Sequence, residues 1–164
     1  MKGLDNMHAV IFAGGAVQPG EAVAAAIASA DLVIAADSGA ETALHYGCTP
    51  AIIVGDFDSL DAPRLQELKT RGSRIVQVAV KKNETDTELA VQAAIEEGAS
   101  AITLLGGLGG ERFDHTMANI LLLAGFEVVH SPCFHSPEML RAYTPPGYTI
   151  HCVGRRCILA GHEV

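Results

Sequence analysis

The sequence predicts an α/β protein: an open, mostly parallel sheet with helices on both faces, followed by a short partial β segment. Three observations support this fold class. Short apolar runs alternate with longer amphipathic segments from residue 8 to residue 124. Each run has the length of a strand and is bounded by Gly, Asp or Pro. Repeated alternation of strand and helix is typical of parallel strands joined by helical crossovers.

The individual elements follow from these patterns. Strands are predicted at residues 8–12, 32–36, 51–54, 75–78, 101–105 and 127–130. Helices whose apolar spacing suits the cover of a sheet are predicted at residues 21–29, 41–46, 62–71, 85–97 and 115–124.

Local signals support the helix boundaries. Thr85 and Glu88 have the spacing of a capping box, and Pro63 falls in a first turn. Gly72 and Gly98 stand where two of the helices should end. After residue 126 the pattern changes, because prolines interrupt the chain and residues 148–153 form a predicted strand with no helix after it. We therefore expect an α/β domain over 1–126, and a final strand with a truncated or divergent C-terminal segment over 127–164.

Composition narrows the function classes. The chain has 164 residues, of which 49% are hydrophobic, enough for one packed domain. Its net charge of −8 argues against binding to nucleic acid, since no basic stripe is present. No apolar run approaches the length of a membrane span or of a signal peptide. The four dispersed cysteines suggest reduced thiols, and we expect a cytoplasmic protein that does not bind membranes.

Acidic residues follow the predicted strands. Asp37 follows the second strand, Asp56 and Asp58 follow the third, and Asp86 opens the helix after the fourth. A glycine-rich turn at 106–110 follows the fifth. Because ligands of open α/β sheets bind outside the carboxyl ends of the strands, these connections should deliver their polar side chains to one rim.

Carboxylates repel a phosphate chain unless a hard divalent cation lies between them. The pair Asp56 and Asp58 can hold such an ion if the segment is extended or forms a turn. A purely structural role is the alternative, in which Asp58 or Ser59 caps the following helix. The acidic rim predicts Mg²⁺ together with a nucleotide polyphosphate.

The glycine turn at 106–110 offers backbone N–H groups to a ligand with no β-carbon in the way. It matches neither the dinucleotide-binding fingerprint nor the P-loop. Arg112 can clamp phosphate, and Asp114 should face the same rim. The structural alternatives are an N-cap role for Asp114 and a first-turn position for His115. Gly14-Gly15 forms a second glycine turn at this rim. It either leaves space for the nucleotide or lets the chain reverse direction.

Four blocks, taken in order and spacing, resemble the thiamine pyrophosphokinase family. They are Ala36-Asp37-Ser38-Gly39, Val54-Gly55-Asp56-Phe57-Asp58-Ser59, the run from Lys82 to Ala90, and the run from Gly106 to Asn119. The resemblance covers about residues 8–124. It implies a catalytic, nucleotide-binding α/β domain that transfers a diphosphate from ATP to the thiamine hydroxyl, giving thiamine diphosphate and AMP. It also implies a homodimer.

The resemblance assigns roles by position. Asp56, Asp58 and Asp86 resemble the magnesium-binding carboxylates, and together with Asp114 they form the predicted catalytic set. Either Asp86 or Asp114 would accept the hydroxyl proton. The remaining nucleotide- and substrate-binding residues are predicted to be Asp37, Ser38, Gly39, Lys82, Thr85, Gly107, Gly110, Arg112 and His115.

The sequence departs from the family at two places. Asn83 stands where the family usually has aspartate, and the chain has no Trp to supply the aromatic residue that covers the thiamine ring. The family's second, β-sandwich domain is not recognisable after residue 124. Three alternatives stay open: a pterin pyrophosphokinase on the same fold, a catalytically incomplete domain that binds magnesium and nucleotide, and a magnesium phosphohydrolase.

Overall fold

A computed structural model of the chain describes residues 7–57, 62–78, 85–108, 113–125, 149–153 and 156–160. The elements run in the order β1 (Met7–Phe12), α1 (Glu21–Ala28), β2 (Leu32–Ala36), α2 (Gly39–His45), β3 (Ile52–Gly55), α3 (Ala62–Thr70), β4 (Arg74–Gln77), α4 (Asp86–Glu96), β5 (Ala99–Leu105), α5 (Phe113–Gly125), β6 (Thr149–Val153) and β7 (Arg156–Ala160).

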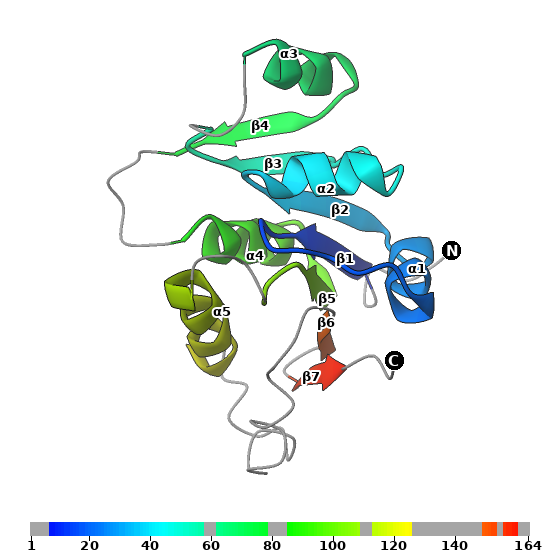
Figure 1. The fold of residues 1–164 in the computed structure, drawn as a ribbon, viewed down its shortest axis with the longest axis vertical. Helices are drawn as coiled ribbons and strands as arrows, with labels where there is room; N and C mark the ends of the chain where they lie inside the picture. The colour runs from blue at the N-terminus through cyan, green and yellow to red at the C-terminus, as the bar shows by residue number, and fades with distance from the viewer. Residues whose placement is uncertain are drawn as a thin grey trace.

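The sheet has the strand order β4-β3-β2-β1-β5-β6-β7 (Figure 1). β1 to β5 are parallel, β6 pairs antiparallel with β5, and β7 pairs antiparallel with β6. β1 lies between β2 and β5, with Ile11 in register with Ile34 on one side and Leu104 on the other. The chain therefore proceeds away from β1 to β4 and then returns across β1 to form β5. The ends of β1 and β5 are the switch point at which the strand order reverses.

Alternate residues of β1 face opposite helical layers. Ala9 and Ile11 of β1 belong to a buried cluster that includes Ala90 and Ala94 of α4. Val10 and Phe12 of the same strand pack in a second cluster against α1 and α2. The larger of these side chains, Val10, Ile11 and Phe12, each contribute about 1.5–3 kcal/mol when they are fully removed from water. The predicted fold, an open and mostly parallel sheet with helices on both faces, is confirmed.

The boundary signals explain where the helices start and stop. Gly72 and Gly98 have φ of +96° and +91°, a left-handed conformation that costs glycine little, and they follow α3 and α4. Thr85 is the N-cap of α4, since its Oγ1 accepts a hydrogen bond from the N–H of Glu88 at 3.1 Å. α4 therefore starts directly after Thr85, the capping residue that the sequence predicted.

Some predicted details are wrong. α5 begins at Phe113, so Asp114 lies within the first turn and is not the N-cap. α2 begins at Gly39, two residues before the predicted start. Strand β7 (Arg156–Ala160) was not predicted, although its pairing with β6 is local in sequence and starts with Val153 opposite Arg156.

The C-terminal predictions are only partly covered by the described residues. The predicted strand at 127–130 lies outside them. The predicted strand at 148–153 corresponds to β6 (Thr149–Val153), which pairs with β5 in the same sheet. The domain boundary at 126 stays a prediction. In the described part of the chain, no helix combines the length and apolarity required to cross a bilayer.

Candidate functional site

Four of the predicted acidic residues, those within the described ranges, lie at the carboxyl ends of the parallel strands. In Figure 1 the strand arrowheads of β1 to β4 and the first turns of α4 and α5 lie toward the same side of the molecule. Asp37 follows β2, Asp56 follows β3, Asp86 opens α4, and Asp114 lies in the first turn of α5. Connections far apart in sequence therefore deliver four carboxylates to the carboxyl rim of the sheet.

Asp37 lies beside the end of β3. Its backbone N–H donates to the Val54 carbonyl oxygen at 2.8 Å, which continues the β2–β3 ladder by one residue. A β-carbon placed on Gly55 would lie 3.2 Å from Oδ1 of Asp37, so glycine leaves space for this carboxyl. Asp37 and Asp56 consequently stand on neighbouring strand ends, about one strand spacing of 4.8 Å apart in the direction of the ladder. Asp56 is half-buried.

The backbone adopts an unusual conformation at Phe57, directly after Asp56. Phe57 has a φ of +60° although it carries a side chain, a conformation that costs roughly 1–2 kcal/mol. The ring is buried at 7% exposure, in a cluster with Ile53 and with Leu68 of α3. Burial of the ring offsets the strained backbone. The backbone is therefore not extended at Phe57, while Asp58, the second carboxylate of the predicted pair, lies outside the described residues.

Asp37 shares this unusual backbone, with a φ of +46°. Aspartate tolerates the left-handed region better than most residues because its short side chain bonds locally. Residues in such conformations cluster at functional sites. In the described ranges, two residues other than glycine have a positive φ. They are Asp37 and Phe57, which lie at the ends of β2 and β3.

The loop that follows β1 and the connection from β2 to α2 pack tightly against each other. A β-carbon on Gly14 would lie 2.8 Å from Oγ of Ser38, and one on Gly39 would lie 2.0 Å from the Phe12 carbonyl oxygen. Real β-carbons essentially never come this close to other atoms. Packing of α2 against the end of β1 thus explains glycine at position 39. Ser38 is half-buried between the first loop and Asp37.

The glycine turn after β5 is held from two sides. The N–H of Gly15 donates to the Gly106 carbonyl oxygen at 2.9 Å. From the other side, Nδ2 of Asn119 on α5 donates to the Gly107 carbonyl oxygen at 2.7 Å. Asn119 is buried at 5% exposure. The turn is therefore fixed to both the β1 loop and the following helix.

The remaining predicted site residues within the described ranges lie at the N-terminal ends of α4 and α5. Asp86 and Thr85 are half-buried at the positive end of α4, where a carboxylate is stabilised by the helix dipole. Asp114 and His115 are exposed in the first turn of α5. α4 and α5 contact each other. Asp58, Lys82, Gly110 and Arg112 lie outside the described residues.

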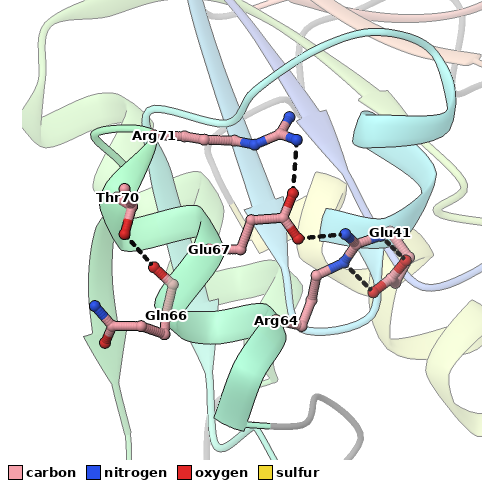
Figure 2. Close-up of polar contacts among 6 residues, drawn as sticks. All are labelled: Glu41, Arg64, Gln66, Glu67, Thr70 and Arg71. Atoms are coloured by element: carbon pink, nitrogen blue, oxygen red, sulfur yellow. Dashed lines mark hydrogen bonds and ion pairs between the residues drawn. The ribbon is translucent and has the colours of Figure 1, made fainter.

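A polar network joins the helices that follow Asp37 and Asp56 (Figure 2). Arg64 of α3 donates to Glu41 of α2 through Nε at 2.9 Å and through a terminal nitrogen at 3.0 Å. Its other terminal nitrogen donates to Glu67 at 2.6 Å, and Arg71 pairs with the second oxygen of Glu67 at 2.6 Å.

These contacts shift the protonation equilibria of the network. The hydrogen bond from Arg64, with a smaller contribution from its charge, lowers the pKa of Glu41, while partial burial opposes this shift. The pKa of Glu67 is lowered mainly by its hydrogen bond from Arg64, with further attraction to Arg71. The ionised network ties α2 to α3 behind the acidic rim.

Sequence reasoning did not assign a role to Asn119 or to the contact between Gly15 and Gly106. A polar amide among the apolar residues of a helix was a signal for Asn119. No comparable signal existed for the glycine contact, because it depends on β1 and β5 being neighbours. Within the described ranges, no three His, Cys, Asp or Glu side chains gather closely enough to hold a metal ion by themselves.

Comparison with known proteins identifies relatives with this fold. A family model described as thiamin pyrophosphokinase, catalytic domain, matches residues 23–133. Thiamine pyrophosphokinase of Bacillus subtilis (strain 168) is 34% identical over 92 residues, which are 56% of this chain and 42% of that protein.

Solved structures give the same result. The crystal structure of the Bacillus subtilis thiamine pyrophosphokinase has a TM-score of 0.60 and 28% identity, covering 73% of this chain and 56% of that one. Thiamin pyrophosphokinase from Geobacillus thermodenitrificans has a TM-score of 0.57 and 31% identity, covering 74% and 56%. The chain thus spans about half the length of the relatives it matches. The family model covers more than half of the chain, and by this match the chain belongs to the thiamin pyrophosphokinase family through its catalytic domain.

Proposed function

We propose that the chain catalyses transfer of a diphosphate group from ATP to the hydroxyl of thiamine, giving thiamine diphosphate and AMP. The observation that carries the proposal is the placement of Asp37, Asp56, Asp86 and the glycine turn on one rim of this family's fold. Carboxylates and backbone donors at one rim suit a phosphate chain with a divalent cation.

The donor set fits Mg²⁺. This ion prefers oxygen ligands and is usually bound by one or two carboxylates, with water and substrate phosphates completing its shell. Asp56 and Asp86 would hold it, together with Asp58 as the sequence predicts. Asp37, with its carboxyl against Gly55 next to Asp56, would lie near the same ion. When bound, the ion offsets phosphate charge and assists an in-line displacement.

The chain's own groups orient the two substrates. The thiamine hydroxyl oxygen attacks the β-phosphorus of ATP, and the bond from that phosphorus to the oxygen bridging the α- and β-phosphates breaks. AMP leaves with the bridging oxygen. The hydroxyl proton passes to a carboxylate, for which Asp86 and Asp114 are the candidates. Arg112 and N–H groups of the glycine turn would bind phosphate oxygens.

Acceptor dependence of AMP formation tests this proposal. The purified chain is incubated with ATP and magnesium, and AMP is measured with thiamine, with a pterin alcohol, or with no acceptor. We expect AMP only with thiamine. If AMP forms only with the pterin alcohol, the acceptor is a pterin and not thiamine. Release of phosphate without any acceptor would indicate a hydrolase.

The proposal includes a cytoplasmic location and a homodimer. The four dispersed cysteines, which form no short disulfide framework in the sequence, support a reducing compartment. The homodimer rests on family resemblance. Sedimentation of the purified chain would test it, since a monomer at micromolar concentration would contradict it.

A further inference from the structure

Asn119 is a buried amide in a helix that is otherwise largely apolar. Its side chain is 5% exposed, and its Nδ2 donates to the Gly107 carbonyl oxygen at 2.7 Å. Burying an amide costs free energy unless the group is hydrogen-bonded. α5 also carries Asp114 and His115 in its first turn, so this bond sets the glycine turn relative to two predicted site residues.

The bond also orients one peptide group of the turn. The described residues contain no cis peptide bond, and a trans peptide is planar, with its C=O and N–H pointing in opposite directions. The Gly107 carbonyl points to Asn119, so the N–H of Leu108, which belongs to the same peptide group, points away from Asn119. The preceding carbonyl, that of Gly106, is engaged by the N–H of Gly15 at 2.9 Å. The carbonyls of Gly106 and Gly107 are thus both directed toward protein donors.

Carbonyl direction matters in a turn that meets phosphate. A carbonyl oxygen facing a phosphate oxygen is repulsive, whereas an N–H facing it is attractive. A β-carbon at Gly107 would lie 2.7 Å from Cδ2 of Leu104, so a larger residue there would require the Leu104 side chain to shift. The same glycine lets the peptide rotate more easily than a larger residue would. A specific donor is therefore needed to keep one orientation.

We propose that Asn119 is a positioning residue that keeps the Gly107 carbonyl turned away from the nucleotide phosphates and leaves the Leu108 N–H to bind them. This inference rests on the proposed nucleotide site. It predicts that Asn119 acts on the phosphate part of a nucleotide and not on its base or ribose.

Asn119→Asp tests the inference, because it preserves size but replaces the donor by a carboxylate that repels the Gly107 carbonyl. The dissociation constants of AMP and of adenosine are measured by calorimetry with magnesium present. We expect AMP binding to weaken by about tenfold, the effect of losing one hydrogen bond to a charged group, with adenosine binding changed by less than about twofold. A merely structural role would weaken both ligands alike.

Asn119→Ala serves as a second variant if Asn119→Asp does not fold, since it also removes the donor and suits a helix. Met117→Ala, at a 43% exposed position of the same helix, is the matched control and should leave both affinities unchanged. An unchanged ratio of AMP to adenosine affinity in the folded Asn119 variant would overturn the inference while leaving the proposed function standing. A wild-type chain that binds neither ligand would overturn both.

Discussion

Gly15 and Gly106 approach each other so closely that neither position has room for a side chain. A β-carbon on Gly15 would lie 2.4 Å from the Gly106 carbonyl oxygen, and one on Gly106 would lie 2.5 Å from that of Gly15. The N–H of Gly15 donates to Gly106 at 2.9 Å, so the ladder between β1 and β5 continues past both strands. The two loops that leave the switch point are thereby joined backbone to backbone.

Gly106→Ala should destabilise the fold by roughly 2–4 kcal/mol, because the new methyl group meets backbone and the φ of +70° is unfavourable for alanine. Urea unfolding measures the change. Gly20→Ala is the control, since a β-carbon there would have no neighbour within 4 Å, and its effect should stay below about 1 kcal/mol. Equal effects of the two substitutions would contradict the packing argument.

Asp56→Asn should lower the rate of AMP formation by at least about a hundredfold, because it removes a charge from the proposed magnesium site with little change in size. Asp86→Asn should act in the same way. Glu96→Gln, on the exposed last turn of α4, is the control and should retain the wild-type rate. The thermal midpoints of all variants establish that they fold. Wild-type rates in Asp56→Asn and Asp86→Asn would remove the proposed metal site.

The ion-pair network should stabilise the protein in a pH-dependent way. The folded-state pKa values of Glu41 and Glu67 lie below their ordinary value of 4.5, so folding favours their ionised forms. This stabilisation is fully present above pH 4.5 and is lost as pH falls through the lowered folded-state values. Because the groups are partly exposed, the total effect should be smaller than that of Gly106→Ala.

Arg64→Met tests the network. Its free energy of unfolding should vary less with pH below 4.5 than that of the wild type, and the difference between them should shrink in high salt. Urea unfolding at several pH values measures both effects. Parallel pH curves for the two proteins would show that Arg64 does not shift the two glutamates.

Thr85→Ala should cost about 1 kcal/mol, because it removes the side-chain acceptor that caps the N–H of Glu88 at the start of α4. Thr70→Ala is a matched control, since the Thr70 hydroxyl donates back to Gln66 within its own helix (Figure 2). Such a bond adds little to helix stability, so the change should stay within about 0.5 kcal/mol. A control loss as large as that of Thr85→Ala would contradict the capping role.

Local patterns predicted much of the fold. The apolar run at 32–36 became β2, and glycines at 72 and 98 ended two helices in the left-handed conformation. Thr85 caps α4 as its spacing with Glu88 indicated. These features depend on neighbouring residues, whose preferences a single sequence displays directly.

Features that depend on tertiary contacts were not predicted. The sequence does not state that β5 returns beside β1, so the need for glycine at 15 and 106 was hidden. Phe57 combines a positive φ with a ring that is buried in a cluster with Leu68 of α3, a packing that the local sequence does not display. The site residues were located by the ends of their strands, but the hydrogen bond from Asn119 required the packing of α5.

Phosphorus NMR of the complete reaction mixture tests the proposed diphosphate transfer, because it identifies which bond of ATP is broken. The chain is incubated with ATP, magnesium and thiamine until product accumulates. Transfer of a diphosphate to thiamine predicts AMP and thiamine diphosphate in equal amounts. ADP with thiamine monophosphate, or inorganic phosphate formed without any thiamine product, would contradict diphosphate transfer.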